Sequence, residues 1–186
     1  MRIEGTTAIV TGAASGLGRA TADVLAAAGA TVAGWDIAFG GGAADDDGML
    51  CLHCDVTSES SVAAALAATG STLGTARILV NCAGILESQR VLGRDGVMAL
   101  DHFRRLIDVH LVGTFNVIRL FADAARWLEP LSEDGDRGVI VNTSSIAGLE
   151  GTIGAVSYSA AKAGIAGMTL PLAREFAREG IRVVAR

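Results

Sequence analysis

The chain contains a single tyrosine and a single lysine, and they lie four residues apart in the stretch YSAAK, at Tyr158 and Lys162. In a helix this spacing places two side chains on one face. A free tyrosine, with a pKa of about 10, is a poor base at neutral pH, but a neighbouring cation favours the phenolate and lowers that pKa. The pair therefore predicts a proton-transfer site in which Tyr158 exchanges the proton and Lys162 supplies the positive charge.

A glycine turn near the N-terminus indicates a nucleotide site. The stretch TGAASGLG places Gly12, Gly16 and Gly18 between an apolar run at 6–11 and a helical pattern from Gly16 to Ala28. Glycines at such a turn let the backbone approach a pyrophosphate, which the helix N-terminus attracts. The spacing G-x-x-x-G-x-G differs from the commoner G-x-G-x-x-G, and glycine can serve turn conformation alone. The strand before and the helix after favour dinucleotide binding.

Two acidic residues follow apolar runs that we predict to be strands. Asp36 ends the run at 31–36, 18 residues after Gly18. An acid there can accept hydrogen bonds from the ribose hydroxyls of NAD and repels the 2′-phosphate of NADP, so NAD is the expected cofactor. The alternative is an ordinary solvated aspartate at a strand end. Asp55, before Val56, either begins a turn or contacts the adenine edge.

Short β-rich runs alternate with helical patterns, which predicts an α/β fold with a parallel sheet between helix layers. We expect one dinucleotide-binding domain over residues 1–186, a Rossmann-type doubly wound sheet with strand order 3-2-1-4-5-6. Six strands are too few for a TIM barrel. The expected strands are 6–11, 31–36, 49–55, 77–84, 138–145 and 181–185; the expected helices are about 16–28, 60–69, 100–128 and 157–178, with an Asp/Gly-rich loop at 40–48.

Composition excludes several function classes. The net charge is −5 and no Lys/Arg cluster occurs, so neither nucleic acid nor an anionic membrane is an expected partner. No apolar run approaches the ~20 residues of a membrane span, and no signal peptide is apparent. Three cysteines give no disulfide framework, which favours the cytoplasm. Cys51 and Cys54 of CLHC are expected to be buried thiols rather than metal ligands, because no second Cys/His pair follows.

The chain resembles the short-chain dehydrogenase/reductase family along its whole length. The resemblance rests on TGAASGLG, Asp36, the pair DV at 55–56, NCAG at 81–84, Ser145 and YSAAK. Within the family, residues 108–120, 138–151 and 158–175 are most similar to the type II 3-hydroxyacyl-CoA dehydrogenase branch. The resemblance implies contacts with NAD from Gly12, Ser15, Gly16, Leu17, Gly18, Asp36, Asp55, Val56, Asn81, Cys82, Ala83, Gly84, Tyr158 and Lys162.

The resemblance also implies a reaction and its catalytic residues. Branch members use NAD to oxidise secondary alcohols, notably 3-hydroxyacyl-CoA esters. Ser145, thirteen residues before Tyr158, is then the group that holds the substrate oxygen, and its neighbour Ser144 is the alternative. Lys162 would also bind the nicotinamide ribose. Two other readings stay open: a 3-oxoacyl carrier-protein reductase, which usually prefers NADP, and an NAD-binding protein without turnover.

Two departures from the family pattern stand out. His110 occupies the place of an asparagine that is expected to hold a water and relay protons to the lysine; a histidine there either takes over this role or is a buried core residue. The family also continues beyond residue 186 with a substrate loop and a seventh strand, so we expect a truncated domain whose sixth strand is an exposed apolar edge. The helices at 100–128 and 157–178 form a four-helix interface in the family, which implies a homo-oligomer, a dimer or a tetramer.

Overall fold

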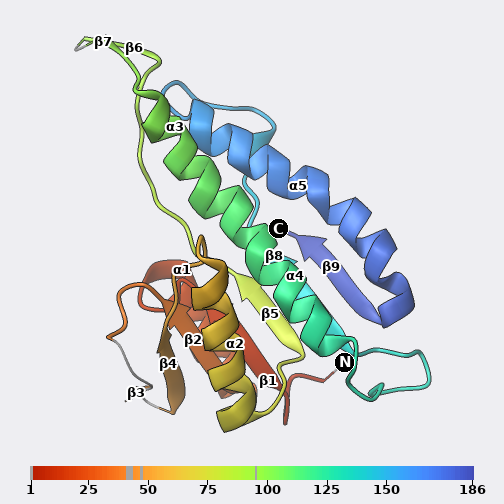
Figure 1. Cartoon of the computed structure of the whole chain (residues 1–186). Coiled ribbons are helices and arrows are strands. Elements are labelled where there is room, and N and C mark those ends of the chain that lie inside the picture. Colours follow the sequence, from red (N-terminus) through yellow and green to blue (C-terminus); the bar gives the residue numbers. More distant parts are fainter. Residues whose placement is uncertain (1, 41–43, 47, 95) are drawn as a thin grey trace.

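The computed structural model describes residues 2–40, 44–46, 48–94 and 96–186. Its main feature is a seven-stranded sheet with the order β3-β4-β2-β1-β5-β8-β9 (Figure 1). The strands are β1 (Thr7–Thr11), β2 (Thr31–Asp36), β3 (Ala44–Asp46), β4 (Met49–His53), β5 (Ile78–Asn81), β8 (Gly138–Asn142) and β9 (Ile181–Ala185). All neighbouring pairs are parallel except β3 with β4.

The predicted strand order is confirmed. The six strands expected from the sequence correspond to β1, β2, β4, β5, β8 and β9, and they lie in the predicted 3-2-1-4-5-6 arrangement. The central strands β1 and β5 are buried at every position. A strand buried on both faces reads as a continuous apolar run, which is why the sequence located these strands well.

The expectation of a loop at 40–48 is wrong for residues 44–46. Residues 44–46 form β3, which pairs antiparallel with β4 at the edge of the sheet. Residues 41–43 and 47 lie outside the described residues. The short strand was missed because the Gly- and Asp-rich composition of this stretch is typical of turns, whereas backbone pairing at a sheet edge does not require apolar side chains.

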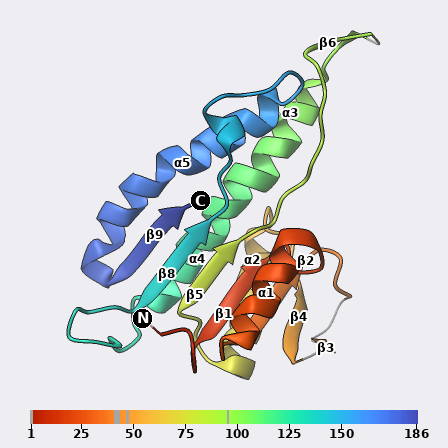
Figure 2. The same ribbon diagram turned by 180° about the vertical axis from the view of Figure 1, so that it is seen from behind.

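The helices form two unequal layers. They are α1 (Gly16–Ala27), α2 (Glu59–Leu73), α3 (Leu100–Ile107), α4 (Gly113–Ala125) and α5 (Val156–Phe176). Helices α2, α4 and α5 cover one face of the sheet, and α1 packs on the opposite face (Figures 1 and 2). Each face has its own core: Trp35, Leu79 and Phe121 belong to the first, and Val10 and Val32 to the second. The predicted sandwich is therefore confirmed over β1 and β2.

On the face of the sheet that carries α1, strands β8 and β9 are less covered than β1 and β2. On β8, Val139 and Val141 are only partly buried, and on β9 Val184 is 46% exposed. Strand β9 pairs with β8 alone among the described strands. None of the helices in the described part of the chain has the length and apolar character needed to cross a membrane.

The single helix predicted over 100–128 is interrupted. A five-residue π-helical segment, Asp108–Val112, lies between α3 and α4, and α4 ends at Ala125. A π segment accommodates an extra residue in one turn and shifts the side chains that follow, which a 3.6-residue pattern cannot reveal. Before α3, a small hairpin of β6 (Leu92–Gly93) and β7 (Gly96–Val97) forms an arm that projects from the body (Figure 1).

Candidate active site

The predicted site residues gather at one edge of the sheet. Strands β1, β2, β5 and β8 end at Thr11, Asp36, Asn81 and Asn142, and because these strands are parallel their carboxyl ends meet at the same edge. In open α/β sheets ligands bind at this edge. A cleft there is lined by residues at the ends of β1, β2, β4 and β5 and by one residue of the π segment: Gly12, Trp35, Asp36, Ile37, Cys54, Asp55, Val56, Ala83, Gly84, Ile85 and Val109.

The glycine turn is shaped by close backbone contacts. Gly12 has φ +71°, and a Cβ on it would lie 2.9 Å from the backbone of Ala83. A Cβ on Gly18 would lie 2.0 Å from the carbonyl oxygen of Gly12. Both contacts exclude any larger residue, and Gly16, with φ +54°, also favours glycine. The turn is thus held tight against the segment that follows β5, as a dinucleotide cradle requires.

The N-terminus of α1 faces outward at this cradle. Ser15 is the N-cap of α1, but its side chain makes no capping hydrogen bond. Ser15, Gly16 and Leu17 are exposed, whereas Gly18 is buried beneath them. The first amide groups of the helix are therefore not satisfied by the capping side chain, and they coincide with the positive end of the helix dipole. This geometry suits a bound phosphate.

Asp36 is fixed at the end of β2 by two backbone donors. Its Oδ2 accepts a hydrogen bond from Ala14 N at 3.1 Å, and its Oδ1 accepts one from Ala38 N at 2.9 Å. Each carboxylate oxygen keeps further acceptor capacity. The half-buried carboxylate lines the cleft beside the glycine turn, so it is available to ribose hydroxyls.

Asp55 and Val56 lie on the far wall of the same cleft. Asp55 Oδ1 accepts hydrogen bonds from the backbone and hydroxyl of Thr57, which is the turn-forming role considered for this residue. Val56 is buried and packs against Gly113, where a Cβ would lie 2.6 Å from the Val56 Cγ2.

The residues of the NCAG segment occupy two kinds of position: Asn81 lies in the sheet, and Ala83 and Gly84 line the cleft. Asn81 is buried, and its Nδ2 donates to Asn142 Oδ1 at 2.9 Å, which links β5 to β8. Cys82 N and Ala83 N both donate to Thr11 Oγ1 at 3.1 Å. Burial raises the pKa of the Cys82 thiol. Ala83 and Gly84 line the cleft itself.

Tyr158 and Lys162 lie one turn apart near the start of α5, as predicted. Lys162 Nζ is 5.6 Å from the centroid of the Tyr158 ring. The ammonium group is buried, and it donates to Thr143 O at 2.7 Å and to Thr143 Oγ1 at 3.2 Å. Burial lowers the pKa of Lys162 to about 8. The lysine is thus held by the end of β8 in a position beside the tyrosine.

The two candidate serines have different partners. Ser144 Oγ donates to the backbone carbonyl of Lys162 at 3.2 Å, so its hydroxyl is occupied by the fold. Ser145 Oγ accepts a hydrogen bond from Ala147 N at 3.1 Å and retains its O–H as a donor. Among the described residues no hydrogen bond links Ser145 to Tyr158. The geometry favours Ser145 over Ser144 as the residue that holds a substrate oxygen.

His110 lies inside the site rather than on its surface. Its side chain is 3% exposed, and its ring meets the Tyr158 ring edge to face, with centroids 5.3 Å apart and an interplanar angle of 86°. Burial lowers the pKa of His110, and the charge on Lys162 lowers it further. The structure therefore brings His110, Tyr158 and Lys162 together.

Sequence reasoning missed two residues that organise the site. Thr11 supports the NCAG backbone, and Thr143 holds Lys162. Each is a threonine at the end of an apolar strand, and this was the signal available. The CLHC stretch behaves as expected, since Cys51 and Cys54 are buried in different cores, and burial raises the pKa of Cys54 to about 12. No group of three His, Cys, Asp or Glu side chains in the described ranges could hold a metal ion.

Comparison with protein families supplies a match over nearly the entire chain. A family model described as short chain dehydrogenase matches residues 6–186. The match begins just before β1, includes the glycine turn and the Tyr158–Lys162 pair, and ends after β9.

Individual relatives agree with this match. The human 3-hydroxyacyl-CoA dehydrogenase type-2 is 45% identical over 98% of this chain and 72% of its own length. The 2-dehydro-3-deoxy-L-rhamnonate dehydrogenase (NAD(+)) of a Sphingomonas strain is 37% identical over 97% of this chain and 70% of its own. The crystal structure of a 3-hydroxyacyl-CoA dehydrogenase type-2 from Mycobacterium avium superposes with a TM-score of 0.88 at 39% identity, covering 100% of this chain and 75% of that one.

Proposed function

The chain belongs to the short-chain dehydrogenase family, and we propose that it oxidises a secondary alcohol, specifically a 3-hydroxyacyl-CoA ester, with NAD as hydride acceptor. The observation that carries this proposal is the juxtaposition of the buried Lys162 ammonium and the Tyr158 ring at the ligand-binding edge of the sheet. The similarity to 3-hydroxyacyl-CoA dehydrogenases supports the substrate class.

Each protein group has one task in this reaction. NAD, when bound, supplies the hydride acceptor. Tyr158 takes the proton of the alcohol, and the positive charge of Lys162 favours the phenolate that accepts it. The Ser145 hydroxyl donates a hydrogen bond to the substrate oxygen and orients the carbinol carbon. Thr143 keeps the lysine in place through two hydrogen bonds.

Asp36 supports NAD over NADP. Replacing it with serine removes the charge that repels a 2′-phosphate and weakens the acceptor for ribose hydroxyls. We expect Asp36→Ser to raise the Kd of NADH by about 10–100-fold, the range of a lost hydrogen bond to a charged group, and to bring the Kd of NADPH close to that of NADH. Fluorescence titration measures both constants. Asp101→Ser, at an exposed position on α3, is the control, and an unchanged NADH/NADPH ratio in Asp36→Ser would contradict the assignment.

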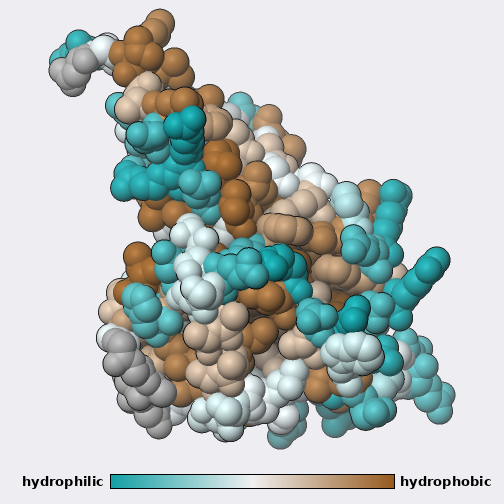
Figure 3. Space-filling view, viewed as in Figure 1, coloured by the Kyte–Doolittle hydropathy of each residue, from teal (hydrophilic) through white to brown (hydrophobic). Residues whose placement is uncertain are grey.

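The surroundings of the site favour an apolar substrate. Leu86, Leu149 and Ile153 are each more than four-fifths exposed on the two segments that flank Ser145 and Tyr158. These segments are linked by a hydrogen bond from Gln89 N to Gly154 O. Further hydrophobic side chains cover the projecting arm that carries β6 and β7 (Figure 3). An acyl chain can therefore lie against an apolar wall.

The direct test is NADH formation. The purified chain is mixed with NAD and 3-hydroxybutyryl-CoA, and the absorbance of NADH is followed. We expect turnover with NAD and little with NADP. NAD binding without NADH formation from any secondary alcohol would identify a nucleotide-binding protein without turnover. A preference for NADP and carrier-protein esters would identify a carrier-protein reductase instead.

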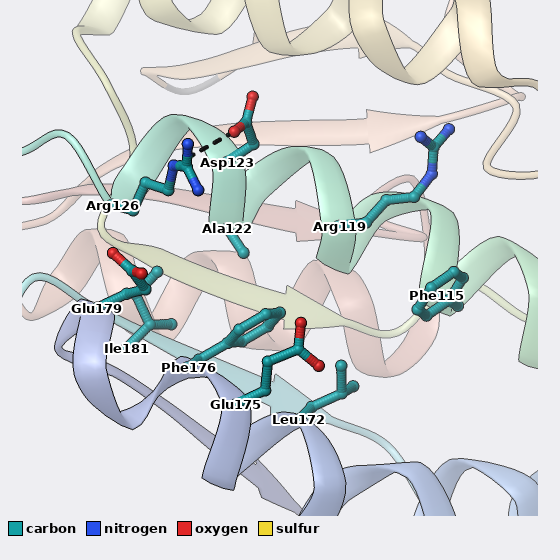
Figure 4. Close-up of a pocket in the computed structure, with 10 residues that line it drawn as sticks. All are labelled: Phe115, Arg119, Ala122, Asp123, Arg126, Leu172, Glu175, Phe176, Glu179 and Ile181. Carbon is teal, nitrogen blue, oxygen red and sulfur yellow. Dashed lines mark ion pairs between the residues drawn. The ribbon is translucent and has the colours of Figure 1, made fainter.

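The face formed by α4 and α5 fits a second copy of the chain. A groove there has an apolar floor that includes Phe115, Leu172 and Phe176. Arg119 on α4 and Arg126 directly after it lie opposite Glu175 on α5 and Glu179 in the 3₁₀ turn that follows α5 (Figure 4). A two-fold axis through such a groove would bring the arginines of one copy to the glutamates of the other. We propose a homodimer through this face; whether two dimers join into a tetramer is open to the same measurement.

Sedimentation velocity tests the dimer. We expect the native chain to sediment as a dimer or larger, and Glu175→Arg to shift it toward monomer, because like charges then meet across the axis. Glu133→Arg, on an exposed loop away from the groove, makes the same charge change and should leave the assembly intact. A monomeric native chain would refute the interface.

We propose that the reaction takes place in a reducing compartment, the cytoplasm. Cys51, Cys54 and Cys82 form no disulfide in the part of the chain that the structure describes, which supports this location.

A further inference from the structure

His110 is a buried polar residue that the proposed reaction does not yet use. It lies at the centre of the π segment Asp108–Val112, and its ring is enclosed by the protein. π segments inside helices are frequent at functional sites, where they reorient one side chain. The two nitrogens of the ring have different surroundings, and this difference defines what His110 can do.

Nε2 is fixed by the backbone of Ile85. It lies 2.8 Å from Ile85 O, and the Ile85 N–H group donates toward it at 3.2 Å. The two contacts need opposite tautomers, because a carbonyl oxygen only accepts and a backbone N–H only donates. The shorter contact, to Ile85 O, favours a proton on Nε2. Burial and the neighbouring Lys162 both lower the pKa of His110, which favours the neutral ring. A neutral imidazole carries one N–H, and Nδ1 is therefore a hydrogen-bond acceptor.

Nδ1 faces the wall of the cofactor cleft. A Cβ on Gly84 would lie 2.4 Å from His110 Cε1 and 2.9 Å from Nδ1, so this edge of the ring rests on Gly84. Gly84 and Ile85 both line the cleft. Nδ1 is buried, and within the described part of the chain it has no hydrogen-bond partner. Leaving a buried acceptor without a donor is unfavourable, and a donor arriving at this position would remove that cost.

We propose that His110 is a positioning residue of this active site: Nε2 anchors the ring to Ile85, and Nδ1 accepts a hydrogen bond from a hydroxyl group held beside Gly84 and Tyr158. The hydroxyl belongs to a water molecule or to the bound dinucleotide. The proposal rests on the proposed function for the identity of the ligand, but not for the state of the ring.

Nitrogen NMR of the histidine side chains tests the ring directly, without turnover. The chain has three histidines, and the signal missing from His110→Asn identifies His110. Near a pH of about 7 we expect a protonated Nε2 and an unprotonated Nδ1. An Nδ1 resonance that already indicates an accepted hydrogen bond identifies water as the donor; one that shifts only on adding NAD identifies the dinucleotide. The opposite tautomer, or an Nδ1 that remains a free acceptor in both states, would overturn the proposal.

Three variants separate the two nitrogens. The side-chain oxygen of asparagine is bonded to Cγ, as Nδ1 is, whereas the amide nitrogen of glutamine reaches as far as Nε2. Phenylalanine keeps the ring and neither polar atom. We expect His110→Gln and His110→Phe to lower kcat/KM by about 5–150-fold, the equivalent of one unmade buried hydrogen bond, and the conservative His110→Asn to restore most of that loss.

The reverse ranking, with glutamine better than asparagine, would show that only the anchor to Ile85 matters and would overturn the role of Nδ1. If kcat/KM falls in all three variants in proportion to their melting temperatures, His110 is a packing residue only, and the proposal is overturned. If the native chain forms no NADH, the proposed function fails while the NMR result still decides the tautomer and the hydrogen bond of His110.

Discussion

Tyr158→Phe is expected to lower kcat by about 10²–10⁴-fold, the contribution of a positioned acid–base group, while the fold and NADH binding persist. The phenol hydroxyl makes no hydrogen bond to any described residue, and the edge-to-face contact with His110 needs only the ring, which phenylalanine keeps. The free energy of unfolding should therefore change little. The measurements are single-turnover NADH formation, the Kd of NADH and the melting temperature.

The neighbouring Ser159 provides a matched control for this change. Its hydroxyl is buried without a hydrogen-bond partner among the described residues, so Ser159→Ala removes an unsatisfied group and should leave turnover near the native value. If Tyr158→Phe retains more than a tenth of native turnover, Tyr158 is not the acid–base group of the reaction. His110 is then the next group to examine for that role.

Lys162→Met is expected to abolish turnover and to make the protein more stable at neutral pH. Burial lowers the pKa of Lys162 from 10.5 to about 8. A lowered lysine pKa means that the charged form opposes folding: the cost is fully present below pH 8 and is relieved as the pH rises toward 10.5. The shift corresponds to a cost of about 3 kcal/mol. Loss of the two bonds to Thr143 offsets about 1–2 kcal/mol of the gain.

Urea unfolding at two pH values checks this sign. We expect Lys162→Met to exceed the native free energy of unfolding by about 1–2 kcal/mol at neutral pH, and to lose that advantage near a pH of about 10. Arg174→Met, an exposed basic residue on the same helix, should change stability by less than about 0.5 kcal/mol at either pH. A variant that is less stable at neutral pH, or an advantage that does not depend on pH, would show that the ammonium is not strained by burial.

The sequence predicted the sheet and the site edge because both depend on local patterns. Apolar runs located the six strands, and the alternation of strands and helices fixed their order. The glycines and the four-residue spacing of Tyr158 and Lys162 placed the cofactor turn and the proton-transfer pair on elements whose ends must meet. Local residue types are sufficient for these features since parallel strands present their carboxyl ends together.

The missed features all depend on contacts between distant segments. The amphipathic sequence pattern continues on both sides of the π segment around His110, so the pattern does not reveal that the helix is interrupted there. Thr143 acquires its role only when β8 brings it to Lys162 of the following helix. Likewise β3 depends on a backbone pairing with β4 that side-chain composition does not encode.

The buried pair Asn81 and Asn142 has a consequence that reaches the chemistry. These residues face each other across β5 and β8, so a slip of one residue between the strands would break the hydrogen bond between their side-chain amides and turn the side chain on the slipped strand to the other face. The next residue, Thr143, donates its hydroxyl to Asn81 O and receives Lys162. The pair therefore sets the alignment of the two strands and, through Thr143, the position of the Lys162 ammonium group. Mutations at Asn142 should accordingly change the position of the Lys162 ammonium group, although the side chains of Asn142 and Lys162 do not share a hydrogen bond.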